Sequence, residues 1–379
     1  MADMNEIKRT WVEINIENAL CNLGQIRKYT GAKVIAVVKA DAYGHGVVEM
    51  AKAYQSAGVD CFAVACLQEA IELRDAGIEK DILILGATPA EGIPLVNQYK
   101  LTQTVFSSEY AKLVSSVMQR EGKCISVHFK VDTGMGRLGF HCMEDDIEAT
   151  AEEIVQAANL DGVKVEGLYM HFADAENPET SFTEKQMSLF ENLLNKLAEK
   201  GCKPHIIHCA NSAAVVNYKK AHLEYVRPGL ILYGLYPDGK KIPELELKPV
   251  MSFKSVVSEI RTVRKGESIS YGRTFTAERD MRVAVVPAGY GDGLARGLSG
   301  FAEFIIHGKR VPVLGRICMD MCVVDISGIE EVKVGDTVTL LGRDGDAEVL
   351  VDEWAKILGT ISYEICCLIT KRVPRVYFK

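Results

Sequence analysis

The sequence of 379 residues lacks several features that would each assign a class of protein. No apolar stretch reaches the roughly 18 uninterrupted residues that a membrane-spanning helix needs. The start, MADMNEIKRTW, is polar and lacks the apolar segment of a secretory signal. The net charge is −7, and no basic run or stripe of aromatic and arginine residues is present. We therefore expect a cytoplasmic protein with neither nucleic acid nor a membrane as partner.

The cysteines also lack an ordered pattern. Eleven of them, an odd number, are spread along the chain, and Cys366 and Cys367 are adjacent. None forms the paired CxxC spacing of a zinc site, and we expect no metal. We interpret most of them as reduced, buried small hydrophobic residues.

No GxGxxG motif follows the first apolar run, which weakens the case for an open dinucleotide-binding sheet. Between residues 33 and 232, eight short apolar runs alternate with helical patterns instead. Runs that are apolar on both faces and joined by helices indicate a parallel sheet covered by helices. Eight of them over roughly 230 residues fit a closed (β/α)8 barrel. The runs are KVIAVV, CFAVAC, ILILG, QTVF, ISVHFKV, VEGLYM, HIIHC and YVRPGLILY.

From about residue 240 the helical periods give way to alternating runs and closely spaced glycine turns, as in MSFKSVVSEIRTV and VKVGDTVTLLG. This pattern predicts a mostly β domain that ends in one helix, near Trp354 to Thr370, and a last strand RVYF. The predicted fold is α/β: an N-terminal (β/α)8 TIM barrel over residues 1–240, followed by a mostly β C-terminal domain over residues 241–379. The first few residues are able to pair with the β domain.

Polar residues follow the apolar runs, at the strand ends where barrels of this kind place their active sites. Lys39 ends the first run in VIAVVKADAYGHG, although a lone lysine there is equally a solvated strand end. Ser212 and Gly229 follow late strands, where barrels commonly bind phosphate, although each alone is an ordinary N-cap serine or turn glycine. A lysine and a phosphate site together indicate pyridoxal phosphate bound as a Schiff base.

Seven motifs, in order along nearly the whole chain, resemble those of the bacterial alanine racemases, a family of barrel-type amino-acid racemases. AVVKADAYGHG resembles the cofactor-lysine motif of that family. The lysine motif alone would leave related barrel enzymes open, but six further motifs support it independently. They are KVDTGMGRLGF, HCANSA, SYGRTF, GYGDG, GRICMD and GTISYEI.

The resemblance implies an isomerase that interconverts L-alanine and D-alanine by a two-base mechanism on a pyridoxal phosphate aldimine and supplies D-alanine for peptidoglycan. Racemisation removes a proton from one face of Cα and delivers one to the other, so it needs two acid/base groups. Lys39 is the first of these catalytic groups, and Tyr271 in SYGRTF matches the second. In the family the second base comes from the partner subunit, which implies a homodimer with shared active sites.

The resemblance also assigns the cofactor contacts. Arg227 would face the ring nitrogen, and because a guanidinium only donates, that nitrogen would stay unprotonated and the ring would be a weaker electron sink. A free tyrosine has a pKa near 10, so Tyr271 needs surroundings that stabilise its phenolate. The resemblance implies a relay for this purpose, in which His171 lies between Tyr271 and Arg227. The phosphate contacts would be Tyr43, Ser212, Tyr363 and the backbone of Gly229 and Leu230. The full cofactor-binding set is Lys39, Tyr43, His171, Asn211, Ser212, Arg227, Gly229, Leu230 and Tyr363.

The substrate carboxylate would be bound by Arg137 and the backbone of Met319, with Asp320 on the same wall, since a guanidinium fork suits a carboxylate. Lys130 matches a lysine that is often carbamylated in the family, which would place a negative charge beside Arg137. The resemblance assigns Tyr290, Arg296 and Arg316 to the substrate entrance, although each is also compatible with an ordinary surface position. His45 has no assigned role.

Three other classes of protein share part of this pattern. A basic amino-acid decarboxylase with the same cofactor is expected to place a carboxylate at the ring nitrogen, where this chain has Arg227. A non-catalytic cofactor-binding barrel would lack the second domain with Tyr271. A serine racemase is expected to carry a smaller polar residue in place of Tyr363, and one hydroxyl in a small pocket gives only modest selectivity.

Overall fold

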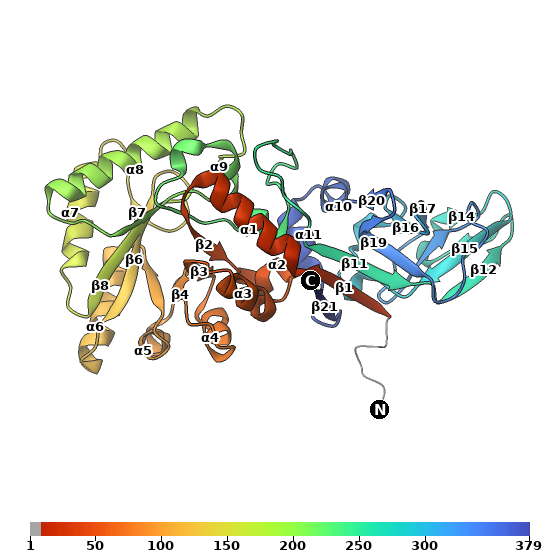
Figure 1. Ribbon diagram of the computed structural model, residues 1–379, viewed down its shortest axis with the longest axis horizontal. Coiled ribbons are helices and arrows are strands. Elements are labelled where there is room, and N and C mark those ends of the chain that lie inside the picture. Colours follow the sequence, from red (N-terminus) through yellow and green to blue (C-terminus); the bar gives the residue numbers. More distant parts are fainter. Residues whose placement is uncertain (1–8) are drawn as a thin grey trace. The chain divides into compact units, whose positions relative to one another are not determined.

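The computed structural model describes residues 9–379 (Figure 1). Their contacts divide them into two units. The barrel unit comprises residues 20–42 and 47–247, and the β unit comprises residues up to 19, 43–46 and 248–379. None of the helices in the described part of the chain has the length and apolar composition needed to cross a lipid bilayer.

The barrel unit contains a closed ring of parallel strands, which confirms the predicted (β/α)8 barrel. Each of the eight apolar runs forms one strand, and the ring closes because β5 pairs with β6 and β10 pairs with β2. The strands are apolar on both faces because one face fills the barrel and the other packs against helices. In chain order they are β2 (Lys33–Val37), β3 (Cys61–Val64), β4 (Asp81–Ile84), β5 (Thr102–Val105), β6 (Ile125–Asp132), β8 (Val163–Tyr169), β9 (Ile206–His208) and β10 (Tyr225–Val226). A short strand, β7 (Phe140–His141), pairs with the end of β6.

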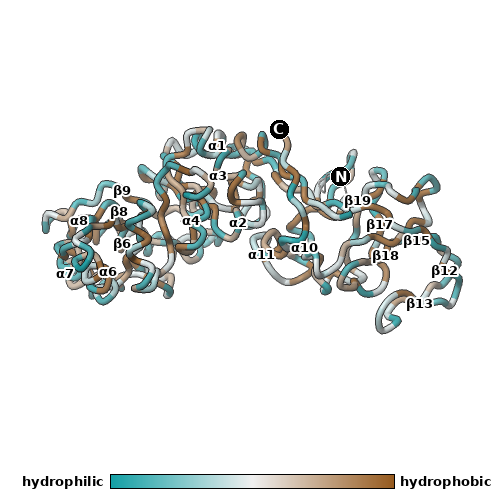
Figure 2. The backbone as a smooth tube through the Cα atoms, turned by 90° about the horizontal axis from the view of Figure 1, so that it is seen from below, coloured by the Kyte–Doolittle hydropathy of each residue, from teal (hydrophilic) through white to brown (hydrophobic). Residues whose placement is uncertain are grey.

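Helices pack around these strands; most bury one side, whereas the short α9 is buried almost throughout. In α8 (Ser181–Glu199), Met187, Phe190 and Leu197 recur at helical spacing and are buried. Figure 2 shows the corresponding alternation of hydrophilic and hydrophobic residues along the barrel helices. The others are α1 (Ile16–Thr30), α3 (Val47–Ser56), α4 (Leu67–Asp75), α5 (Ile93–Gln98), α6 (Ser108–Glu121), α7 (Ile147–Ala158) and α9 (Ser212–Asn217).

The helical turn after the first barrel strand, α2 (Lys39–Gly44), is left-handed. Ala40, Asp41, Ala42 and Tyr43 have φ values of 52° to 54°, and Gly44 has a φ of 78°. In this conformation Cβ of an L-residue crowds the following carbonyl oxygen, at a cost of roughly 1–2 kcal/mol per residue. Such strain is maintained only where surrounding interactions enforce it, and it is concentrated at functional sites.

The β unit is built around a long, mostly antiparallel sheet with the order β12-β15-β18-β17-β16-β19-β11-β1-β21, in which only β1 and β21 pair in parallel. A smaller ladder joins β13 (Ser268–Ile269) to β14 (Phe275–Thr276), and β20 (Ala347–Val349) pairs with β19. The strands of the main sheet are β1 (Thr10–Asn15), β11 (Met251–Val256), β12 (Glu259–Val263), β15 (Met281–Val286), β16 (Glu303–Ile306), β17 (Lys309–Leu314), β18 (Cys322–Asp325), β19 (Thr337–Asp344) and β21 (Arg375–Phe378).

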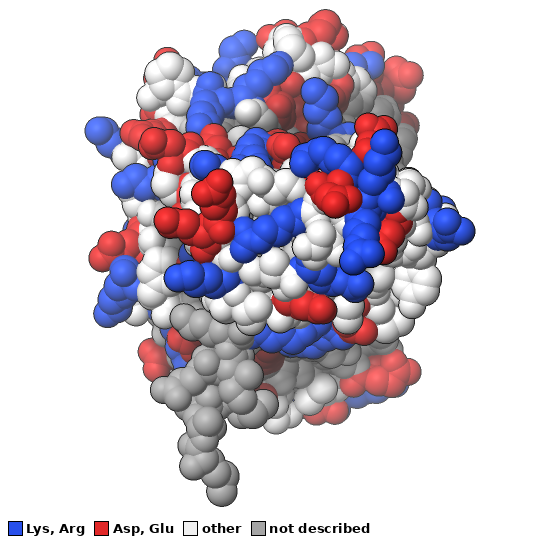
Figure 3. Space-filling model, turned by 90° about the vertical axis from the view of Figure 1, so that its right-hand side faces the viewer, with Lys and Arg blue, Asp and Glu red and all other residues white. Residues whose placement is uncertain are grey.

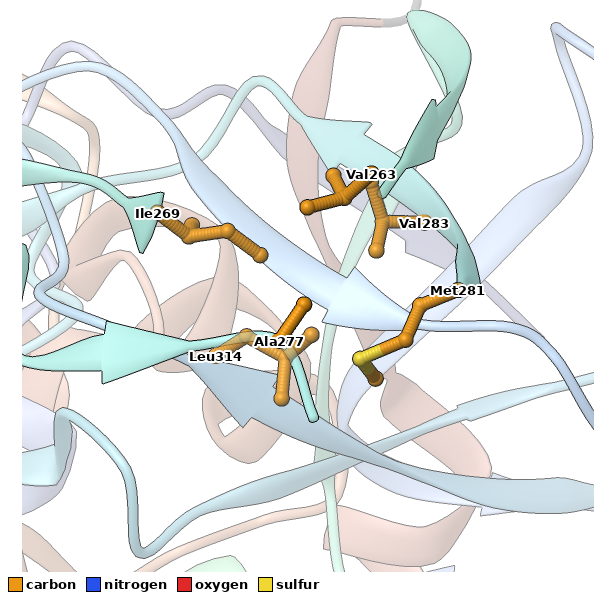
Figure 4. Packing of buried hydrophobic residues seen from close by; sticks show 6 residues of the cluster. All are labelled: Val263, Ile269, Ala277, Met281, Val283 and Leu314. Carbon is orange, nitrogen blue, oxygen red and sulfur yellow. The ribbon is translucent and has the colours of Figure 1, made fainter. Parts of the chain in front are cut away.

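A small apolar cluster joins residues of β12, β13, β15 and β17 (Figure 4). It consists of Val263, Ile269, Ala277, Met281, Val283 and Leu314. The cluster supports the segment between β13 and β14, which carries Tyr271.

On the face that Figure 3 shows, basic and acidic side chains are interspersed.

The prediction of a single helix near residues 354–370 is wrong. The structure has two shorter helices there, α10 (Val351–Leu358) and α11 (Ser362–Leu368). Gly359 adopts a φ of 67° at the end of α10, a left-handed stop that glycine makes at little cost. Ile361 is extended before α11, so the helical pattern restarts after a break of three residues.

Candidate functional site

Lys39 directly follows strand β2 and Val38, at the carboxyl end of the barrel, and its side chain is half-buried. The left-handed turn after it is fixed by two carboxylates. Glu69 accepts hydrogen bonds from the amides of Ala40 and Ala65, both at 2.7 Å, and Asp41 accepts one from the amide of Val47 at 2.8 Å. These bonds offset part of the backbone strain and hold the lysine at the end of the first strand.

Lys130, near the end of β6, is almost completely buried and donates a hydrogen bond to the carbonyl oxygen of Leu138 at 2.6 Å. Burial, reinforced by the positive charge of Arg137, lowers the pKa of Lys130 to about 8. The loop that carries Arg137 is folded around Asp132, whose carboxylate accepts four backbone amide bonds from residues 134–137 at 2.7 to 3.1 Å.

Arg227 follows β10 and is buried, with donors directed to the ends of the two preceding strands. Its Nη2 donates to the carbonyl oxygens of Met170 at 2.8 Å and Cys209 at 3.0 Å. Its Nη1 contacts Nδ1 of His208 at 2.8 Å, and the guanidinium lies 5.0 Å from the ring centre of Tyr169. The arginine is therefore held in one orientation by strand ends and aromatic rings.

A chain of buried groups continues from Arg227 into the barrel. Because a guanidinium only donates, Nδ1 of His208 must accept, so the ring proton lies on Nε2 and is donated to Nδ1 of His128 at 2.9 Å. Burial lowers the pKa of His128 to about 4 and that of His208 well below its ordinary value. Both rings are therefore neutral, with their tautomers set by Arg227.

The backbone makes room for this histidine pair. The pairing of β6 with β8 shifts register between Val127 and His128, and Gly167 of β8 lies against the ring. A Cβ atom on Gly167 would lie 2.7 Å from three atoms of the His128 ring, closer than real contacts allow. Glycine at this position is thus required by the packing of His128.

His171 follows β8 and contacts two of the other predicted site residues. Its Nδ1 lies 3.3 Å from Nη2 of Arg227, and its Nε2 lies 3.4 Å from the side-chain amide nitrogen of Asn211. Burial lowers the pKa of His171 well below its ordinary value, and the positive charges of Arg227, Arg137, Lys130 and Lys39 add to the shift. The ring is therefore neutral.

Ser212 and Gly229 meet directly at the late strand ends. The amide of Gly229 donates to Oγ of Ser212 at 2.9 Å, which leaves the hydroxyl hydrogen for another acceptor. Asn211 caps α9 through a hydrogen bond from the amide of Ala214 at 3.0 Å. Leu230 begins the 3-10 turn Leu230–Tyr233 directly after Gly229.

The remaining predicted residues lie in the β unit. Tyr271 is 70% exposed and begins a turn of three residues, Tyr271–Arg273. Its neighbours Ser270, Gly272 and Arg273 have positive φ values. The hydroxyl of Ser270 donates to the carbonyl oxygen of Arg316 at 2.5 Å, so this turn is tied to the GRICMD segment. The phenol of Tyr271 is thereby presented outward from a fixed backbone.

The other predicted site residues in the β unit make local contacts. The rings of Tyr43 and Tyr363 lie with centres 6.0 Å apart. The amide of Tyr290 donates to the carbonyl oxygen of Cys318 at 3.0 Å, next to Met319 and Asp320. Arg296 begins a 3-10 turn, Arg296–Leu298, and the Ser299 hydroxyl that follows it accepts the amide of Ile317 at 3.0 Å.

The sequence predictions missed side chains that support these groups: His128 and His208 in the barrel, and in the β unit the buried Asp292, which forms ion pairs with Arg9 and Arg372. A signal for the histidines exists in the sequence, because each interrupts an apolar strand run, in ISVHFKV and HIIHC. A polar side chain within a barrel strand must find a buried partner. Read in this way, the two runs would have indicated an internal polar pair.

Comparisons with known proteins agree with this arrangement. Residues 14–237 match the family described as alanine racemase, N-terminal domain, and residues 250–377 match alanine racemase, C-terminal domain. Alanine racemase 1 of Clostridium acetobutylicum is 42% identical over 98% of this chain and 96% of its own length. The alanine racemase of Methanococcus maripaludis is 44% identical over 97% of this chain and 98% of its own. A solved structure of alanine racemase from Clostridium difficile 630 superimposes with a TM-score of 0.92 at 40% identity, covering 98% of this chain and 96% of that one. The chain therefore belongs to the alanine racemase family.

Proposed function

We propose that this chain is a pyridoxal-phosphate-dependent racemase that interconverts L-alanine and D-alanine. The observation that carries the proposal is Arg227, a buried group that can only donate, at the strand ends of a barrel whose first strand is followed by Lys39. A decarboxylase with this cofactor is expected to place a carboxylate where Arg227 lies. The supply of D-alanine for peptidoglycan in the cytoplasm is part of the proposal and rests on the family alone.

The donor set fits pyridoxal phosphate. Ser212 has its oxygen occupied by the Gly229 amide, and its remaining hydroxyl hydrogen suits a phosphate oxygen. The family resemblance adds Asn211, Leu230, Tyr43 and Tyr363 to this binding set. When bound, the cofactor supplies an electron-withdrawing ring that acidifies the Cα hydrogen of the amino acid. Arg227 would donate to the ring nitrogen without protonating it, which limits that withdrawal and suits a reaction that only moves a proton.

Two groups of the chain move the proton. Lys39 is the covalent anchor of the cofactor and the acid/base on one face of Cα, and Tyr271 is the acid/base on the other. The phenol of Tyr271 needs a neutral partner that can share its proton, and the neutral ring of His171, in contact with Arg227, supports that role. Arg137 and the Met319 amide would hold the substrate carboxylate.

The proposal includes a homodimer in which Tyr271 of each chain serves the barrel of its partner. The 70% exposure of Tyr271, on a rigid turn, supports a role at a subunit boundary. Asp320 and the entrance residues Tyr290, Arg296 and Arg316 would come from the same partner. A monomer would then have no complete site, because its barrel would lack the tyrosine supplied by the partner subunit.

The test is to incubate the purified protein, with pyridoxal phosphate, and L-alanine in D₂O. We expect D-alanine that carries deuterium at Cα, because inversion through proton exchange takes the new hydrogen from solvent. Chiral chromatography with mass spectrometry measures both features. Exchange without inversion would contradict the pair of acid/base groups, and absence of exchange with cofactor bound would contradict the racemase assignment.

The proposal also includes carbamylation of Lys130. The neutral amine would attack CO₂, form an N–C bond and release its proton to water, which leaves an anion beside Arg137. A pKa of about 8 supports this, because the amine is neutral at a pH where an exposed lysine is still protonated.

With ¹³C-labelled bicarbonate, we expect a carbamate signal in the ¹³C NMR spectrum that rises as the pH increases through about 8. Below that pH the amine is protonated and cannot attack. The Lys130→Arg variant is the control and should lack the signal. A wild-type spectrum at pH 9 without a Lys130-dependent signal would reject the modification.

A further inference from the structure

Asp292, in the GYGDG motif, is a fully buried carboxylate with no role so far in the proposed reaction. Arg9 donates to both of its oxygens, at 2.9 and 3.2 Å, and Arg372 donates through Nε at 2.8 Å. The amide of Gly289 adds a bond at 2.9 Å. Burial alone would raise the pKa of Asp292, but these donors lower it below its ordinary value, so the group is an anion.

The turn that carries Asp292 is joined to the segment with the proposed substrate-binding amide. The amides of Tyr290 and Gly291 donate to the carbonyl oxygens of Cys318 and Met319, at 3.0 and 2.9 Å. A Cβ atom on Gly289 would overlap the same two carbonyl groups. The two turns are therefore in direct backbone contact, and the glycine is what permits it.

The two arginines reach from Asp292 to the same segment. Nη2 of Arg372 donates to the Asp320 carboxylate at 2.9 Å and contacts the carbonyl oxygen of Met319 at 3.3 Å. Nη2 of Arg9 donates to the carbonyl oxygen of Asp320 at 3.0 Å. Each guanidinium thus spans from the buried carboxylate to the segment that contains Met319 and Asp320.

The charges of this group balance, with two arginines against Asp292 and Asp320. If the charge of Asp292 were removed, two half-exposed guanidinium groups would keep only one carboxylate partner. They would then no longer be held in the orientation from which they contact Met319 and Asp320. The buried anion therefore fixes the peptide and also keeps the two arginines occupied.

We propose that Asp292 is a positioning residue that, through Arg9 and Arg372, holds the Met319 peptide and Tyr290 in the arrangement that binds the substrate carboxylate. The inference rests on the proposed function, because it assigns the Met319 amide to the substrate. Asp292 itself does not touch the substrate.

The test compares steady-state constants of wild-type holoenzyme, Asp292→Asn and Arg372→Lys. We expect KM for alanine to rise about tenfold in both variants, the order expected for loss of one charge-assisted bond. The turnover number should stay within about threefold, because Lys39 and Tyr271 are untouched. The inhibition constant of propionate, a carboxylate without the amine, should rise by the same factor as KM.

Arg310→Lys is the matched control, since Arg310 also bridges two carboxylates in the β unit, Glu303 and Glu353, at similar exposure. Its KM should equal that of the wild type. If a thermal unfolding measurement shows that Asp292→Asn is not folded, the result for Arg372→Lys decides whether the inference holds. An unchanged KM, or a loss confined to turnover, in a folded variant would overturn the inference, whereas an inactive wild type would overturn the proposed function instead.

Discussion

Replacing Lys39 by alanine is expected to lower the rate of racemisation of L-alanine and of D-alanine by at least about 10³-fold. It should also remove the absorbance of covalently bound cofactor. Under the proposed function, the variant loses the anchor of the cofactor and one of the two acid/base groups together. The free energy of unfolding should change little, because Lys39 is half-buried at a strand end and its turn is held by Glu69 and Asp41.

The barrel unit also holds Lys130, a buried amine whose pKa is lowered to about 8, so two lysines are candidates for the anchor. Reduction of the holoenzyme with borohydride, followed by peptide mass spectrometry, identifies the lysine that carries the cofactor. We expect the label on Lys39 alone. A label on Lys130, or a bound-cofactor spectrum that persists in Lys39→Ala, would disprove the assignment.

Replacing Tyr271 by phenylalanine is expected to keep the cofactor spectrum and to lower racemisation of L-alanine by about 10² to 10⁴-fold, the usual contribution of a general acid or base. Because the side chain is 70% exposed, the free energy of unfolding should change by less than about 0.5 kcal/mol. Initial rates with L-alanine and with D-alanine, together with Cα deuterium exchange, measure the effect.

Tyr99→Phe, a change of the same single hydroxyl on a half-buried tyrosine that follows α5 in the barrel unit, is the control and should retain wild-type rates. The result that would defeat the pair of acid/base groups is full turnover of L-alanine by Tyr271→Phe. Loss of cofactor absorbance in this variant would instead indicate a binding role.

The barrel was predictable because its signal is local. Each strand is a short apolar run, and the order of runs and helices along the chain decides the topology. The positions of Lys39, Lys130 and Arg227 near strand ends were predictable for the same reason, since each lies within two residues of the end of its strand.

Other features depend on partners far away in the sequence. Asp292 binds Arg9 across 283 residues and Arg372 across 80, and no local pattern encodes either contact. The division of α10 from α11 was missed because apolar residues continue at helical spacing across Gly359. The left-handed turn had no signal either, because alanine, aspartate and tyrosine favour right-handed conformations and only tertiary contacts override that preference.

That turn has a consequence for the order in which the barrel assembles. Local propensity opposes the conformation of residues 40–43, so it does not persist in a partly folded chain. Glu69, which holds its first amide, belongs to α4 and becomes available only once β2, β3 and α4 have docked. We therefore expect Lys39 to reach its final position late in folding, after the neighbouring strands have paired. A chain trapped before that step would have most of its secondary structure but would lack this turn.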